Sequence, residues 1–287
     1  MSIYNVKHFT KIEQIPENIF FFLNENPFSN YETLQSLEEL KANPGKYEGL
    51  LECLIVEKNG IIQVLTFRVP PYNLMISHAC ELTAVKAIVE YIGKERIQVP
   101  GIFGPSEACS LFVEEWENMY GEGFQTSNES WFFLLEKLNQ LPKNIGNVLT
   151  ASGEHKKVLF RWSEASILEL IPNSPETFYE SCRKNLTMRI RDKKIFILVV
   201  NETIVSMGSI TGKYRDMQFI SDVYTPPEHR RKGYATELCT QLVRKIKKDN
   251  NNRPVLTVFV SNEKAMRIYT KIGFKRKTKV AIYLKQN

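Results

Sequence analysis

One segment of the chain combines the residue types that hold a phosphorylated ligand. Residues 223–235 read Val-Tyr-Thr-Pro-Pro-Glu-His-Arg-Arg-Lys-Gly-Tyr-Ala, which is a strand end, a Pro-Pro turn and a basic stretch with one glycine. An amphipathic helix is expected next, over about 233–248. Glycine lets a backbone approach a ligand closely, and the first N–H groups of a helix have no partners within that helix. The segment therefore predicts a cradle for a pyrophosphate group.

A second group of polar residues follows about 30 residues downstream. An apolar strand is expected over 254–260, followed by Asn262 and by a short helix over 263–272. Asn262 could contact a ligand or cap this helix, and the two roles are compatible. Tyr269 falls on the apolar stripe of the helix, so an ordinary core tyrosine is one interpretation of it.

Together the two segments resemble a known family. Arg230-x-x-Gly233-x-Ala235 resembles the acyl-CoA signature of the GNAT superfamily of N-acyltransferases, and Asn262 through Phe274 resembles the second half of that family's core. The resemblance implies that an amine attacks the thioester of acetyl-CoA directly and takes up the acetyl group. It also implies that Tyr269 protonates the departing thiolate. The cofactor-binding residues that we expect are Val223, Tyr224, Thr225, Arg230, Arg231, Lys232, Gly233, Tyr234, Ala235, Thr236 and Asn262.

The general base cannot be identified from the sequence. Ser221 and Asp222 lie near the end of a strand, whereas Glu228 and His229 lie on the turn and are expected to face solvent. We take Asp222 as the candidate, because an acid beside the acceptor could also act through a water molecule.

The order of elements around these motifs occurs twice. In the C-terminal half, strands are expected near 195–200, 204–211 and 217–225, and a last strand near 274–285. In the N-terminal half, strands are expected near 50–57, 61–69, 72–77 and 99–103, helices over 80–95 and 106–120, and a last strand from Phe124. Gly123-Phe124 and Gly273-Phe274 stand 150 residues apart. We therefore predict an α/β protein of two GNAT-like domains, residues 1–145 and 146–287, each with a mixed, mostly antiparallel sheet flanked by helices, and a linker between Leu141 and Ser152.

The N-terminal half departs from the pattern at the phosphate loop. Residues 75–83 read Met-Ile-Ser-His-Ala-Cys-Glu-Leu-Thr, with no glycine, no Arg or Lys, and a glutamate where phosphates would lie. We expect this half to bind no cofactor, to close the cleft and to shape the acceptor pocket. His8, His78 and His155 share no metal-ligand spacing with any acid or cysteine, so no metal site is expected.

Charge and composition narrow the classes of partner. The net charge of +6 divides into +12 over residues 228–287 and −6 over residues 1–227, which suits a coenzyme carrying several phosphates. Nucleic acid is the disfavoured alternative, because aromatic and basic residues do not interleave. A non-catalytic acyl-CoA-binding or regulatory module is the other alternative. Five cysteines without C-x-x-C spacing, and the lack of a signal-peptide pattern or membrane span, favour a cytoplasmic protein. The acceptor, a small-molecule or protein amine, stays unidentified, and a homodimer is left open.

Overall fold

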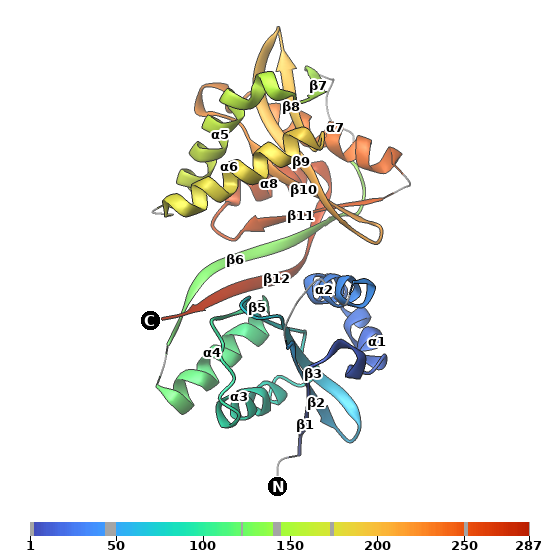
Figure 1. The fold of residues 1–287 in the computed structure, drawn as a ribbon. Coiled ribbons are helices and arrows are strands. Elements are labelled where there is room, and N and C mark those ends of the chain that lie inside the picture. The colour runs from blue at the N-terminus through green and yellow to red at the C-terminus, as the bar shows by residue number, and fades with distance from the viewer. Residues whose placement is uncertain are drawn as a thin grey trace. The chain divides into compact units, whose positions relative to one another are not determined.

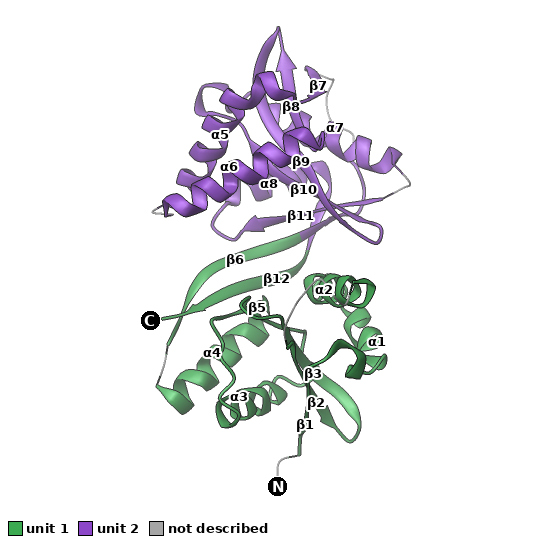
Figure 2. Cartoon of the chain, in the orientation of Figure 1, with its two compact units in different colours: residues 1–132, 277–287 green, residues 133–276 purple. Residues whose placement is uncertain are grey.

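The computed structural model describes residues 3–43, 50–121, 123–139, 145–172, 175–249 and 252–286. The chain forms two compact units, which are coloured separately in Figure 2. Unit 1 contains residues 1–132 and 277–287, and unit 2 contains residues 133–276. None of the described helices is both long enough and apolar enough to cross a membrane.

Unit 1 is a mixed sheet with helices packed on it (Figure 1). Its strands lie in the order β1-β2-β3-β4-β5-β12-β6, and all the pairings from β1 to β12 are antiparallel except β4 with β5. One side of α3 packs into an apolar cluster of this unit through Val85, Ile88 and Ile92, together with Phe112 of α4. The elements are β1 (Asn5–Phe9), α1 (Asn18–Glu25), α2 (Tyr31–Ala42), β2 (Glu52–Lys58), β3 (Ile61–Arg68), β4 (Leu74–Ile76), α3 (Ala84–Lys94), β5 (Gly101–Pro105), α4 (Ser106–Tyr120) and β6 (Phe124–Leu135).

Unit 2 has the same kind of sheet, with the strand order β6-β11-β10-β9-β8-β7. The pairings among β7, β8, β9 and β10 are antiparallel, and β10 pairs with β11 in parallel. The elements are β7 (Asn147–Thr150), α5 (Lys156–Leu170), α6 (Glu176–Arg191), β8 (Ile195–Val200), β9 (Thr203–Tyr214), β10 (Met217–Tyr224), α7 (Tyr234–Lys248), β11 (Arg253–Phe259), α8 (Glu263–Ile272) and β12 (Phe274–Lys285).

The helix α7 begins and ends where its sequence requires. Leu238, Leu242 and Val243 are fully buried, and they recur at the spacing of one helical face. Gly233 precedes the helix with a φ of +82°, a left-handed conformation that glycine adopts without strain. The basic residues of its last turn lie where the helix dipole is negative. The loop before α7 is therefore joined to a rigid helix.

Two long strands belong to both units. β6 starts in unit 1 and its residues 133–135 lie in unit 2, whereas β12 starts in unit 2 and its residues from Lys277 onward lie in unit 1. Val280–Leu284 of β12 pair with Gly101–Pro105 of β5. The compact units therefore differ from the expected ranges 1–145 and 146–287, because the C-terminal strand completes the sheet of unit 1. Within the expected linker, Leu141–Asn144 lie outside the described residues, and residues 147–150 form β7.

The predicted fold class is confirmed: the structure is mixed α/β, and its pairings are mostly antiparallel. The sequence analysis left several elements unassigned, namely β1, α1, α2, β7, α5 and α6.

Candidate active site

The loop between β10 and α7 presents unpaired backbone N–H groups. The first backbone bond into α7 runs from Glu237 N to Gly233 O, so the N–H groups of residues 231–236 find no acceptor in the described part of the chain. A Cβ added at Gly233 would meet nothing closer than Ile145, at 3.8 Å. The described residues therefore leave space for a Cβ at Gly233, beside a positively polarised helix start that favours an anion. The expected contacts of Tyr234, Ala235 and Thr236 would be made through these N–H groups.

The strands β10 and β11 separate on the side that leads to this loop. Their parallel pairing joins Met217–Phe219 to Arg253–Val255 and ends there in the described residues, although both strands continue to Tyr224 and Phe259. β10 stays paired to β9 beyond that point, with Ile220 opposite Ile210 and Tyr224 opposite Met207. The edge of β10 that faces β11 therefore carries main-chain groups that an extended ligand could pair with, including those of Val223.

Arg230 is held in place by several contacts. Its Nη2 lies 2.7 and 2.8 Å from the two carboxylate oxygens of Glu169 on α5, and its Nε donates to Thr225 O at 2.8 Å. The Tyr224 hydroxyl also donates to Glu169, at 2.9 Å. Burial, and then Glu169, raise the pKa of Tyr224 to about 12. These contacts fix the shape of the loop, whereas the side chains of Arg231 and Lys232 are exposed.

Asp222 lies at an irregularity of β10, between Ser221 and Tyr224. Its φ is +53°, which is uncommon for a residue with a side chain and turns it away from the regular strand geometry. Its Oδ2 accepts a 2.7 Å hydrogen bond from Ser209 and contacts Arg189 of α6. The carboxylate is thus oriented by two neighbours, and it is partly exposed, with 38% of its side chain accessible.

Tyr269 is buried in α8, with 8% of its surface accessible. Its ring packs edge-on against Phe274, with the centroids 6.0 Å apart. Burial, with a smaller contribution from Cys239, raises the pKa of Tyr269 well above its ordinary value. The phenol therefore keeps its proton at neutral pH, as a proton donor must. The same burial fits the core-tyrosine interpretation, so the two remain to be separated by experiment.

Asn262 caps α8. Its Oδ1 accepts a 3.1 Å hydrogen bond from Ala265 N, which satisfies one of the free N–H groups at the start of the helix. The capping role is therefore observed, and contact with a cofactor stays a prediction.

The corresponding loop of unit 1 has a different construction. Three of its N–H groups are already used: Ser77 N donates to Leu65 O, Cys80 N to Gln63 O, and His78 N to Asn30 Oδ1. A Cβ at Gly104 of β5 would lie 2.2 Å from Ile76 O, so β4 and β5 approach closely where β10 and β11 separate. In this loop the N–H groups of residues 77, 78 and 80 are therefore not available to a ligand, and β4 and β5 stay close together beside it.

The sequence analysis missed the partners that orient these groups. Glu169, Arg189 and Ser209 come from α5, α6 and β9, and they reach the site only through the fold. An apolar stripe with Leu159 and Trp162, both buried, was the available signal for α5. No sequence spacing indicates the contacts of Arg189 or Ser209.

The fold is that of the GNAT superfamily. Residues 160–274 match the family model described as Acetyltransferase (GNAT) family, and this part of the chain belongs to that family. No curated protein matches the chain by sequence.

Solved structures share the fold along the whole chain. An acetyltransferase of the GNAT family from Colwellia psychrerythraea is 10% identical, with a TM-score of 0.58, over 99% of this chain and 100% of the other. A GCN5-related N-acetyltransferase from Sphaerobacter thermophilus is 13% identical, with a TM-score of 0.60, over 99% of this chain and 95% of the other. At these identities the likeness concerns the fold alone.

Proposed function

We propose that the protein transfers an acetyl group from acetyl-CoA to a primary amine, and that unit 2 carries the reaction. The observation that carries the proposal is the separation of β10 from β11 beside the Gly233 loop. The free edge of β10 suits the extended amide-containing arm of the coenzyme, and the N–H groups around Gly233 suit its pyrophosphate. A neighbouring N–H near Val223 would donate to the thioester oxygen as it gains charge.

Two side chains would handle the protons. A neutral amine must lose a proton on attack, and Asp222, held by Arg189 and Ser209, is the candidate to accept it directly or through water. The leaving thiolate must gain a proton, and Tyr269 keeps one available. The bond from the carbonyl carbon to sulfur breaks, and the bond from that carbon to the amine nitrogen forms.

The experiment is a turnover assay with acetyl-CoA against a broad panel of amines, read by the thiol released. Turnover with any amine, lost in Asp222→Asn while coenzyme A still binds, would support the proposal and the role of Asp222. Binding of coenzyme A without turnover on the whole panel would favour the non-catalytic acyl-CoA-binding module. Strong, salt-dependent binding of DNA or RNA without coenzyme A binding would favour the nucleic-acid alternative.

A further inference from the structure

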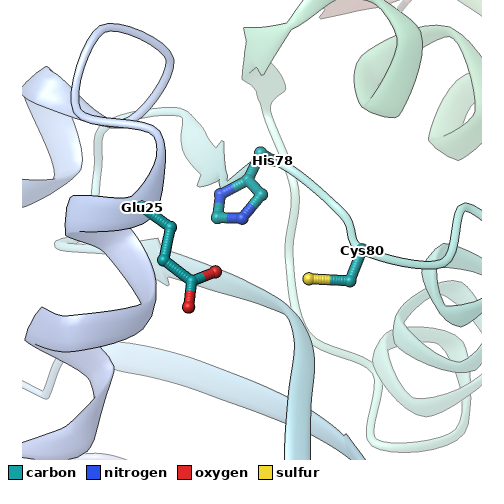
Figure 3. Close-up of side chains that lie close together, drawn as sticks. All are labelled: Glu25, His78 and Cys80. Atoms are coloured by element: carbon teal, nitrogen blue, oxygen red, sulfur yellow. The ribbon is translucent and has the colours of Figure 1, made fainter.

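Three side chains of unit 1 face a common point outside the proposed acyl-transfer site. They are Glu25, the last residue of α1, and His78 and Cys80, from the loop after β4. One carboxylate oxygen, one ring nitrogen and the thiol sulfur all lie within 4.8 Å of one another. Figure 3 shows the His78 ring between the Glu25 carboxylate and the Cys80 sulfur.

The His78 ring is fixed in place by several contacts. It stacks on Phe22, with the centroids 4.4 Å apart, and its Nδ1 lies 2.8 Å from Asn30 Nδ2. The main-chain carbonyl oxygen of His78 accepts a 2.6 Å hydrogen bond from Ser77 Oγ. The other ring nitrogen, Nε2, is buried and has no hydrogen-bond partner in the described structure. A buried polar atom without a partner is costly, so a ligand that engages Nε2 would stabilise this arrangement.

Two acids lie near Cys80, and Glu25 is the one whose exposed side chain is available for a ligand. Glu81, the other acid beside Cys80, is held by Lys58 at 2.7 and 2.9 Å and by the Tyr4 hydroxyl at 2.7 Å. Glu25 and Cys80 are both exposed, so their side chains can rotate, whereas His78 cannot do so freely. The arrangement thus has one fixed donor and two adjustable ones.

We propose that Glu25, His78 and Cys80 form a binding site for a zinc ion. Thiolate sulfur and imidazole nitrogen suit zinc, whereas magnesium and calcium prefer oxygen ligands alone. A tetrahedral zinc ion places its donor atoms about 3.3–3.6 Å apart, given bonds of about 2.0–2.3 Å. The donor atoms lie within 4.8 Å of one another, and rotation of the Glu25 and Cys80 side chains can bring them to these distances. Three protein ligands leave the fourth position to water or to another small ligand.

Protons move when the metal binds. Asn30 Nδ2 donates to His78 Nδ1 in the structure, because Asn30 Oδ1 accepts from His78 N and Nδ2 also donates to Leu23 O. The ring proton therefore lies on Nε2. Zinc takes the Nε2 lone pair, the ring proton moves to Nδ1, and the thiol proton of Cys80 is released to solvent. Asn30 must then give up its bond to Nδ1, which weakens the site but leaves all three donors in place.

The segment that replaces the phosphate loop thus carries metal ligands instead. The sequence analysis expected no metal site. His78 and Cys80 stand two residues apart, but Glu25 precedes His78 by 53 residues, so only the fold brings the third donor to the other two.

The test uses the full chain, stripped of metal with a chelator that is then removed. Calorimetric titration with zinc chloride should give one equivalent per chain. Loading with Co²⁺ should give the near-ultraviolet absorption of a thiolate–cobalt bond. Cys80→Ser and Glu25→Gln should each weaken zinc binding by roughly tenfold or more, and Cys80→Ser should abolish the cobalt band.

Matched controls decide whether the effect belongs to this site. Cys182→Ser removes a half-buried cysteine of unit 2, and Glu81→Gln removes the neighbouring acid, so both should bind zinc like the parent. Asn30→Asp supplies an oxygen acceptor to the protonated Nδ1 and should bind zinc more tightly when it folds. The proposal is overturned if the parent takes up no zinc, if Cys80→Ser binds like the parent, or if Cys182→Ser loses as much affinity.

Discussion

The guanidinium of Arg230 spans from α5 to the loop before α7. Its Nη2 contacts both carboxylate oxygens of Glu169, and its Nε donates to Thr225 O. Arg230 also lies over the ring of Tyr224, with 5.5 Å between its central carbon and the ring centroid. The first arginine of the basic motif therefore braces the loop, and the next two residues carry the exposed positive charge.

Because Arg230 braces the loop while Arg231 and Lys232 are exposed, we expect their replacement to affect different properties. In the double variant Arg231→Gln/Lys232→Gln, coenzyme A affinity should fall about five- to tenfold at low salt, and its salt dependence should become shallower. Arg230→Gln should instead lower the free energy of unfolding by about 1 kcal/mol, because Glu169 and Thr225 O lose their donor. Calorimetry at several salt concentrations and urea unfolding measure both effects. Equal salt slopes in the parent and the double variant would remove these two residues from the cofactor site.

Gly233 provides the sharpest test of where the cofactor binds. Gly233→Val places a branched side chain in the open space and at a φ of +82°, so coenzyme A affinity should fall at least tenfold, about 1.4 kcal/mol. Gly233→Asn tolerates that φ better and should fold more stably, yet it should still bind weakly. Gly212→Val, where a Cβ meets nothing within 4 Å, is the control and should bind normally. Normal affinity in a folded Gly233→Val protein would move the site elsewhere.

We expect one coenzyme A per chain. The loop N–H groups of Ser77, His78 and Cys80 are occupied, and Gly104 closes the space beside β4. Titration of the full chain should therefore give a single equivalent, which Gly233→Val abolishes or weakens. A second equivalent that persists in that variant would show that unit 1 also binds the cofactor.

Tyr269→Phe separates catalysis from packing. Phe keeps the ring against Phe274 and deletes only the oxygen, so the variant should fold and bind acetyl-CoA. Loss of a positioned proton donor should lower kcat by about 10² or more. If kcat stays within about threefold of the parent, Tyr269 belongs to the core alone.

The raised pKa of Tyr269 also predicts an alkaline effect on stability. Burial keeps the phenol protonated in the folded state, whereas it loses its proton near pH 10 in the unfolded state. The contribution of the protonated Tyr269 phenol to the free energy of unfolding is therefore complete below about pH 10, and it is lost as the pH rises further. Urea unfolding between about pH 9 and 11 should show a shallower decline in Tyr269→Phe than in the parent. Some decline remains, because the pKa values of Tyr31 and Tyr224 are also raised.

Local sequence signals were sufficient for much of the fold. The predicted helix over 106–120 matches α4, and the predicted helix over 263–272 matches α8, because an apolar stripe and a glycine after the last turn mark both. The strand over 195–200 matches β8 for a similar reason, since it is a short apolar run. The position of Gly233 before α7 was also evident, because its role depends on backbone conformation within a few residues.

The remainder depends on contacts that sequence spacing does not encode. Asp222 acquires its left-handed φ from an irregularity in the pairing of β10 with β9, and its partner Arg189 is 33 residues away. The helix α6, which supplies Arg189, buries only Leu186 and Ile190, so its apolar stripe is too weak to identify it. The pairing of β12 with β5 could not be predicted from local sequence either, because it joins residues about 180 apart in the chain.

The pairing of β12 with β5 bears on the order in which the chain acquires its structure during synthesis. The ribosome releases residues 1–132 long before residues 280–284, yet those last residues hydrogen-bond to β5 between the N-terminal strands and β6. The N-terminal unit must therefore wait, with an open sheet edge, until residues 280–284 have been synthesised. A nascent chain stalled before residue 280 would expose that edge to other chains, and a fragment ending at Leu135 would carry the same defect permanently.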